Sequence, residues 1–242
     1  MILNIQDDIL KLHSLGLLDK LLLDKTTGKR VMWATDAYSG LGPRYGRNEE
    51  ITPELITGPN ASIIRTRARK EMEQQSSRTR QHGEVSTPVW VCERMCCYAD
   101  EMWNSKARWQ KYVDARVLEI TCGEAPFLVS RYDAETGEAI PVPDRIGLLD
   151  RKLRVVNENT QTEEDWLKWA FRAFHATYGY EFQGDNLLIA RVNLLMTFEE
   201  YLWERWRRKP TLSEYGKLIT VIVWNVWQMD GLHGTIPYST AE

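Results

Sequence analysis

The feature that most constrains the fold lies mid-chain, where a short apolar run ends in a tight turn. Residues 115–120 read Ala-Arg-Val-Leu-Glu-Ile, a strand-like segment, and residues 121–126 read Thr-Cys-Gly-Glu-Ala-Pro, a turn. A new apolar segment starts at Phe127. Amphipathic segments with helical periodicity lie on both sides of this run, so helical and extended patterns alternate. That alternation predicts an α/β fold with a parallel sheet.

Apolar residues recur at helical spacing in several long segments. One of these begins at Thr162, with Asp165 three residues on, a spacing typical of a capping box. The expected helices cover residues 5–24, 62–80, 89–109, 162–177, 185–207 and 210–224. Tryptophans recur within and after them at a spacing that favours core positions: Trp166, Trp169, Trp203, Trp206, Trp224 and Trp227. Further extended passages are expected at 178–182 and within 225–232.

Two stretches interrupt this pattern. Residues 29–60 are rich in Gly, Pro and Asn, and a long irregular segment of this kind is usually functional or wrapped around a partner. Residues 133–145 contain Gly137, Pro141 and Pro143, and the stretch of about 133–160 is interpreted as an inserted loop. We therefore expect an N-terminal helical and irregular extension over 1–83. An α/β domain over 84–242, with an insertion at about 130–160, completes the prediction.

Composition and charge exclude several classes of protein. The net charge is −3, with 43% hydrophobic and 27% charged residues, as in folded globular domains rather than disordered tails. The N-terminus lacks a basic signal-peptide start, and no apolar stretch reaches membrane-spanning length. The cysteines do not follow a zinc-finger spacing, so we expect no metal and reduced thiols in a cytoplasmic protein. These cysteines are Cys92, Cys96, Cys97 and Cys122.

Three acidic residues stand at comparable places in the predicted sheet. Glu119 and Glu181 end two strands, and Asp230 lies where a third strand passes into a loop. Ligands of open parallel sheets bind at the carboxyl ends of the strands. Gly123 permits a tight turn there. A carboxylate can accept both hydroxyls of a ribose, and another can accept from the amino group of adenine. The pattern predicts a nucleoside-containing cofactor.

The turn does not match a dinucleotide fingerprint. Ala125 and Pro126 stand where later glycines would be, and Glu181 follows Gly123 by 181 − 123 = 58 residues, against about 20 in that fingerprint. A turn with one glycine offers few backbone N–H groups to a pyrophosphate. A cofactor without phosphate, such as S-adenosylmethionine, therefore fits better than NAD.

Four segments in order resemble motifs of N6-adenine DNA methyltransferases of the gamma arrangement, in particular the subunit M methylases of restriction–modification systems. They are Thr-Pro-Val-Trp at 87–90, Val-Leu-Glu-Ile-Thr-Cys-Gly-Glu-Ala-Pro-Phe-Leu at 117–128, Gly-Tyr-Glu-Phe at 179–182 with Ala-Arg-Val-Asn-Leu at 190–194, and Asn-Val-Trp-Gln-Met-Asp-Gly-Leu at 225–232. The resemblance runs from about residue 30 to 237. It implies a partial Rossmann-like sheet that binds S-adenosylmethionine.

The same resemblance implies roles for individual residues. Thr87 and Pro88 would line the methionine end of the cofactor. The turn beneath it would be formed by Glu119, Cys122, Gly123 and Phe127. Glu181 would bind the ribose, and Asp230 would bind the adenine amino group.

The family's catalytic tetrad, Asn/Asp-Pro-Pro-Tyr/Phe, does not occur in this sequence. Its amide or acid accepts from the target amino group, and its aromatic ring stacks on the flipped base. We therefore expect no catalytic residue here and no methylation of DNA by the chain alone. A second polypeptide would supply the catalytic and target-recognition parts. The alternative is a non-catalytic methylase-like module that binds DNA or a restriction partner and regulates or decoys it.

A basic segment follows the irregular stretch and is a candidate for contacts with double-stranded DNA. A solvated helix face is the alternative interpretation. The candidate residues are Arg65, Arg67, Arg69 and Lys70.

Overall fold

The computed structural model describes residues 1–70, 87–103 and 108–238. Its strands are β1 (Val117–Glu119), β2 (Thr177–Glu181) and β3 (Val226–Gln228). Its α-helices are α1 (Ile5–Ser14), α2 (Leu18–Leu21), α3 (Pro53–Ile56), α5 (Val89–Trp103), α6 (Trp109–Asp114), α7 (Leu148–Asn159), α8 (Glu163–His175), α9 (Gly184–Trp206) and α10 (Leu212–Asn225). Short 3₁₀ helices occur mainly in the first 70 residues, among them η4 (Arg67–Arg69).

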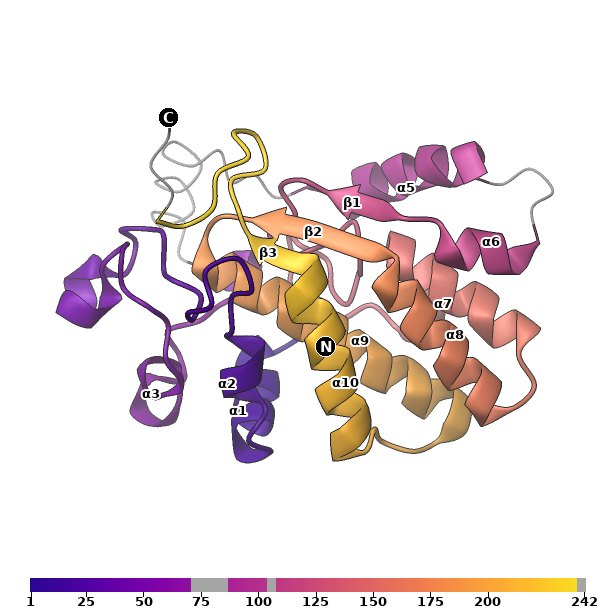
Figure 1. Cartoon of the computed structure of the whole chain (residues 1–242), viewed down its shortest axis with the longest axis horizontal. Helices are drawn as coiled ribbons and strands as arrows, with labels where there is room; N and C mark the ends of the chain where they lie inside the picture. The colour runs from indigo at the N-terminus through magenta and orange to yellow at the C-terminus, as the bar shows by residue number, and fades with distance from the viewer. Residues whose placement is uncertain (71–86, 104–107, 239–242) are drawn as a thin grey trace.

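The three strands form one parallel sheet in the order β1-β2-β3. Helices α7 and α8 connect β1 to β2, and α9 and α10 connect β2 to β3 (Figure 1). Parallel neighbours need such crossover connections. The predicted α/β class and parallel sheet are confirmed, and so are strands at 115–120 and 178–182. Within 225–232 only Val226–Gln228 is extended in the sheet.

Helix α9 lies at the centre of the molecule and is buried over most of its length. Its Arg191 side chain is fully buried and donates to the carbonyl of Val226 from Nε at 3.0 Å and Nη2 at 2.7 Å. Beneath the other edge of the sheet, the buried Lys152 of α7 donates to the carbonyl of Ala115. Burial lowers the pKa of Lys152 to about 8. Both side chains donate to main-chain oxygens beside the sheet, which satisfies buried polar groups on both sides of each contact.

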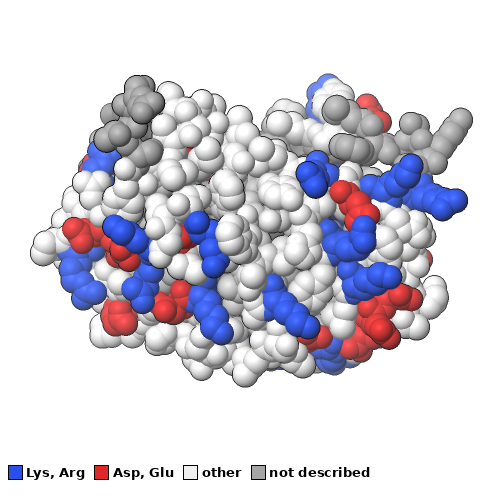
Figure 2. Space-filling view, viewed as in Figure 1, with Lys and Arg blue, Asp and Glu red and all other residues white. Residues whose placement is uncertain are grey.

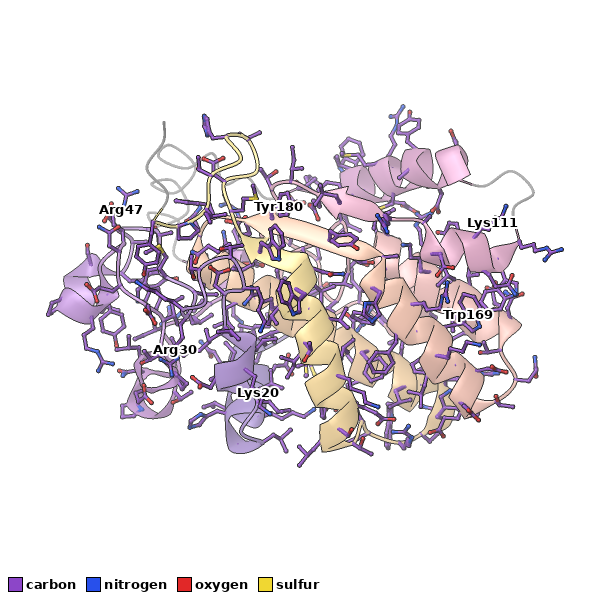
Figure 3. All side chains as sticks on the ribbon, viewed as in Figure 1. Lys20, Arg30, Arg47, Lys111, Trp169 and Tyr180 are labelled. Atoms are coloured by element: carbon purple, nitrogen blue, oxygen red, sulfur yellow. The ribbon has the colours of Figure 1, made fainter. Side chains whose placement is uncertain are left out.

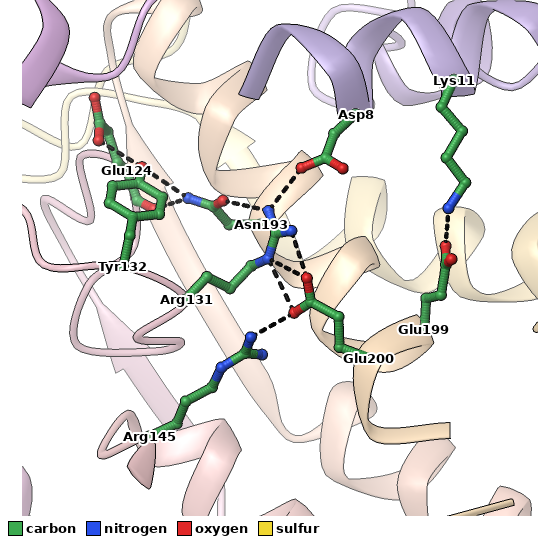
Figure 4. Close-up of polar contacts among 9 residues, drawn as sticks. All are labelled: Asp8, Lys11, Glu124, Arg131, Tyr132, Arg145, Asn193, Glu199 and Glu200. Atoms are coloured by element: carbon green, nitrogen blue, oxygen red, sulfur yellow. Dashed lines mark hydrogen bonds and ion pairs between the residues drawn. The ribbon is translucent and has the colours of Figure 1, made fainter. Parts of the chain in front are cut away.

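The N-terminal helices pack against α9. Ile5, Ile9 and Leu12 of α1 belong to the same buried cluster as the apolar residues of α9. A buried ionic network reinforces the contact (Figure 4): Arg131 pairs with Asp8 of α1 at 3.0 Å and with Glu200 of α9 at 2.6 Å. The first 23 residues therefore share one core with the α/β part of the chain.

Three expectations from the sequence are corrected. The helix predicted over 5–24 is divided into α1 and α2, because Gly16 takes a left-handed conformation with φ +68°. The basic helix predicted over 62–80 is absent from 62–70, where only η4 is helical, and 71–80 lie outside the described residues. The loop predicted over 133–160 contains α7, a buried helix with Leu149, Leu153 and Val156 in the core.

The other helices agree with the sequence. Thr162 caps α8 by accepting from the backbone N–H of Asp165 at 3.2 Å, as predicted. Helix α5 matches 89–103 of the predicted 89–109, and the domain boundary expected between 83 and 84 lies outside the described residues. Within the described part of the chain, no helix has both the length and the apolar surface needed to cross a membrane.

Candidate functional site

Two carboxyl groups meet at the carboxyl edge of the sheet. Glu119 is the last residue of β1 and Glu181 the last residue of β2, the neighbouring strand. The Oε2 atom of Glu119 is buried and has no hydrogen-bond partner among the described residues. Burial, and secondly the negative charge of Glu181, raise the pKa of Glu119 well above its usual range. The site therefore holds a carboxyl group whose ionised form has no compensating cation among the residues that the structure describes.

The turn after β1 is bonded to the second acid. Glu181 accepts from the backbone N–H of Gly123 at 2.9 Å through Oε2 and from that of Gln183 at 2.8 Å through Oε1. The N–H of Cys122 donates to the carbonyl of Tyr180 at 2.8 Å, and that of Ala125 to the carbonyl of Cys122 at 2.7 Å. These N–H groups of the turn donate to oxygen atoms of the protein itself, so they do not point outward to receive a pyrophosphate.

Two left-handed residues, separated by Glu124, shape this turn. Gly123 has φ +54°, a conformation that glycine adopts without steric cost. Ala125 has φ +66°, which costs a residue with a Cβ roughly 1–2 kcal/mol. Strained backbone is often found where a site needs it. The predicted role of Gly123 in a tight turn is confirmed by its geometry.

The start of α5 lies beside Glu119. Thr87 and Pro88 precede this helix, and the carbonyl of Pro88 accepts from the N–H of Cys92 at 3.1 Å. Burial raises the pKa of Cys92 to about 12, and the nearby charge of Glu119 adds to the shift. The structure thus brings the first turn of α5, through Cys92, near the end of β1.

Cys122 and Phe127 lie on the inner side of the same turn. The Sγ atom of Cys122 is 3.1 Å from the point where a Cβ on Gly179 would stand, so Gly179 admits the thiol against β2. Phe127 is half-buried, and its carbonyl accepts from the N–H of Leu148 at 2.8 Å and from Cys96 Sγ at 3.6 Å. These contacts anchor the turn to α5 and α7.

The loop after β3 reaches across the sheet edge to the end of β1. The N–H of Met229 donates to the carbonyl of Glu181 at 3.2 Å. A Cβ on Gly231 would stand 1.8 Å from the carbonyl oxygen of Ile120, so only glycine fits this approach. The backbone on either side of Asp230 therefore joins the ends of all three strands.

The carboxylate of Asp230 is engaged within its own turn. It accepts from the N–H of Leu232 at 3.0 Å and of His233 at 3.1 Å, and it pairs with His233 Nδ1 at 2.8 Å. Burial opposes its ionisation, but these bonds outweigh burial and lower the pKa of Asp230. These contacts are those of an aspartate that stabilises a turn. Each carboxylate oxygen has two lone pairs, so capacity for one more donor remains on Oδ2.

The basic residues predicted to contact DNA do not lie on one helix face. Lys70 is buried and pairs with Asp185 at 3.2 Å, with 3% and 0% of the two side chains exposed. This placement argues against a phosphate contact by Lys70. Arg69 is exposed and donates to Asn4 at 3.1 Å, and Arg65 donates to the carbonyl of Ser62 at 2.8 Å. The half-buried Arg67 donates its backbone N–H to Glu124 at 2.6 Å.

Sequence reasoning missed the residue that joins the irregular N-terminal segment to the sheet. Gln228 is fully buried, accepts from the N–H of Met32 at 2.9 Å and donates to the carbonyls of Met32 and Phe182 at 2.8 Å. A Cβ on Gly184 would stand 2.0 Å from the carbonyl oxygen of Met32. The available signal in the sequence was Gln228 itself, an amide residue within an otherwise apolar extended passage and two positions before Asp230.

No protein-family model, curated protein or solved structure matches this chain. Any function must therefore be argued from the order of the motifs and from the geometry of the sheet edge.

Proposed function

We propose that the carboxyl edge of the sheet binds S-adenosylmethionine, and that the chain is the cofactor-binding part of a DNA (adenine-N6) methyltransferase of a restriction–modification system. The observation that carries the proposal is the buried Oε2 of Glu119, which has no hydrogen-bond partner among the described residues and lies near Glu181. A ligand with an ammonium and a sulfonium group would supply the missing positive charge. Burial of a carboxylate is favourable only when such a partner is present.

The residues around the edge fit the parts of this ligand. Glu119, with Thr87 and Pro88 at the start of α5, would face the methionine end. Glu181 would accept from the ribose hydroxyls while it holds the turn at Gly123, because a carboxylate has about four acceptor sites and can accept from several donors at once. Asp230 would accept from the adenine amino group through its remaining capacity. When bound, the cofactor supplies an electrophilic methyl group.

The turn favours this cofactor over a dinucleotide. The backbone N–H groups of Cys122, Gly123 and Ala125 donate to protein oxygens. A pyrophosphate would have to displace those bonds. S-adenosylmethionine has no phosphate and leaves them in place.

Methyl transfer to DNA is proposed to need a second polypeptide, because the sequence has no Asn/Asp-Pro-Pro-Tyr/Phe tetrad. Double-stranded DNA is the proposed substrate of the assembled enzyme. The four cysteines are free thiols, which supports a reducing compartment, and we propose the cytoplasm. If the chain binds no cofactor, the second candidate is the regulatory or decoy module.

Titration calorimetry with S-adenosylmethionine tests the proposal. We expect the wild-type chain to bind the cofactor and Glu181→Gln to bind it at least about tenfold more weakly, a change of about 1.4 kcal/mol. Glutamine keeps one oxygen to accept from the turn. Glu204→Gln, an exposed position on α9, is the control and should bind as the wild type does. Absence of heat with the folded wild-type protein would contradict the proposal.

A second assay addresses the chemistry. Tritium from the methyl-labelled cofactor should not be transferred to double-stranded DNA by this chain alone. Transfer at a rate above background would show that the chain carries its own acceptor site, and the need for a second polypeptide would be wrong.

A further inference from the structure

One face of the parallel sheet carries a continuous set of apolar side chains. Successive residues of a strand point to opposite faces, and residues paired across neighbouring strands point to the same face. The register pairs Leu118 with Tyr178 and Tyr180 with Trp227. The rings of Tyr180 and Trp227 stack with centroids 5.9 Å apart, which confirms their common side. We call this the open face: Leu118, Ile120, Tyr178, Tyr180 and Trp227.

The open face is turned towards the viewer in Figure 3, where Tyr180 stands in front of the strands. Leu118 is 49% and Ile120 45% exposed. At the end of α10, Trp224 extends the face. Its indole is 53% exposed, and its carbonyl accepts from Trp227 Nε1 at 2.7 Å. The buried side chains of α9 lie on the opposite side of the sheet, where Arg191 reaches β3.

A parallel sheet is normally covered on both faces, because its crossover connections place helices there. Here one face shows half-exposed aliphatic and aromatic side chains side by side. Contiguous apolar surface of this kind marks interaction sites. We propose that the open face binds a partner polypeptide through an amphipathic helix whose apolar stripe is flanked by acidic residues.

The charges beside the open face favour a partner helix whose apolar stripe has acidic flanks. Arg116 precedes β1 and follows the same alternation as Leu118, and it forms no ion pair within the described residues. The ammonium group of Lys25 lies 5.4 Å from the centroid of the Trp224 ring and likewise has no acidic partner there. Figure 2 shows mostly uncharged side chains over the upper middle of the view, with charged side chains of both signs below and to both sides. Acidic flanks on the helix would complement the two cations that have no acidic partner among the described residues, Arg116 and Lys25.

The same features disfavour two other occupants. A second copy of the chain would bring its own Arg116 and Lys25 against the same two cations of the first. A nucleic acid stacks its bases on aromatic rings. The β1 part of the face offers only the aliphatic Leu118 and Ile120. A helix with a Leu-rich stripe covers both the aliphatic and the aromatic part.

The test uses two synthetic peptides, each of about 18 residues and roughly 27 Å as a helix, with the same Leu stripe and flanks of either Glu or Lys. Fluorescence anisotropy is read at protein concentrations up to about 100 µM, which detects binding with a dissociation constant up to about that concentration. We expect the Glu-flanked peptide to bind at least about tenfold more tightly than the Lys-flanked peptide. Equal binding, or none of the Glu-flanked peptide, would overturn the proposal.

Two sets of variants locate the binding. Leu118→Thr with Ile120→Thr places a β-branched strand former at both positions and should weaken binding of the Glu-flanked peptide at least about fivefold. The control is Trp203→Ser with Leu212→Thr, which removes exposed apolar side chains from the far ends of α9 and α10 and should leave binding unchanged. Arg116→Glu with Lys25→Glu should reverse the preference between the two peptides.

Other outcomes would also decide the question. Preferential binding of single-stranded DNA, lost in the Leu118→Thr, Ile120→Thr variant, would replace the proposed helix with a nucleic acid. Dimers in sedimentation that the same variant dissociates would assign the face to a second copy. The proposal does not depend on cofactor binding, and each of these readouts is independent of S-adenosylmethionine.

Discussion

The carboxylate of Glu181 accepts a hydrogen bond of 2.9 Å from the backbone N–H of Gly123, which lies 58 positions earlier in the chain. This bond joins the turn after β1 to the end of β2. It gives the second acid a structural task in addition to its proposed contact with ribose. Variants of the turn, of the two acids and of the surrounding packing should therefore show which residues stabilise the fold and which ones bind the cofactor.

Gly123→Ala tests the left-handed turn. At φ +54°, and with open space around the added methyl group, the cost is backbone strain alone, so the free energy of unfolding should fall by about 1 kcal/mol. Gly216→Ala is the matched control. Gly216 lies within α10 with nothing near its Cβ position, and alanine there should raise the free energy by up to about 1 kcal/mol. Urea denaturation measures both, and a shift of the same sign in the two variants would contradict the assignment.

Glu119→Gln tests the buried carboxyl. Because burial and Glu181 raise its pKa in the folded state, Glu119 binds its proton more tightly there than in the unfolded chain. Its contribution to stability is full below the unfolded pKa of about 4.3 and is lost as pH rises through the folded pKa, by up to about 1.4 kcal/mol per pH unit. The variant lacks this loss, so its stability relative to wild type should increase between pH 5 and 8. Parallel pH profiles in urea denaturation would contradict the prediction.

Arg131→Ala tests the buried ionic network. The substitution leaves the carboxylates of Asp8 and Glu200 without their partner and should cost about 3–5 kcal/mol. Lys11→Ala breaks the more exposed pair with Glu199 and should cost less than about 1 kcal/mol. Thermal or urea denaturation compares the two. Similar losses for both variants would show that burial of the network does not determine its contribution.

Gly231→Ala tests the crossing of the β3 loop over the sheet edge. The methyl group would stand 1.8 Å from the carbonyl oxygen of Ile120, so the loop must move, at a cost of roughly 1–3 kcal/mol. Hydrogen exchange should accelerate at the amides of Asp230 and Gly234, which are bonded within this loop. Gly40→Ala, where nothing lies near the added methyl, should leave exchange unchanged. Unaltered protection in Gly231→Ala would disprove the close approach.

Local sequence signals predicted the elements that position the site. The run ending at Glu119 and the passage ending at Glu181 are strands because short apolar segments bounded by turns have few alternatives in an α/β chain. Thr162 caps α8 because its hydroxyl and the N–H of Asp165 are close in sequence. Each of these features depends on contacts within a few residues.

Long-range contacts decided the rest. The segment at 65–70 is not an α-helix. Lys70 is held in a buried pair with Asp185, and the N–H of Arg67 is bonded to Glu124. Such tertiary contacts override helix propensity. The helical spacing of Trp224 and Trp227 predicted core positions, yet Trp224 is 53% exposed, because one face of the sheet is not covered by the described helices. No local sequence pattern determines which face of the sheet the helices cover.

The most direct test of the account measures protons released when S-adenosylmethionine binds at pH 7. Calorimetry in two buffers of different ionisation enthalpy gives the number. A cation placed beside Glu119 should favour ionisation of this carboxyl, whose pKa is raised in the free protein, so we expect the wild type to release protons on binding and Glu119→Gln to release fewer. Adenosine, which carries no cation, should release none. Binding without proton release, or no binding at all, would contradict the claim that the carboxyl edge of the sheet receives an adenosyl sulfonium.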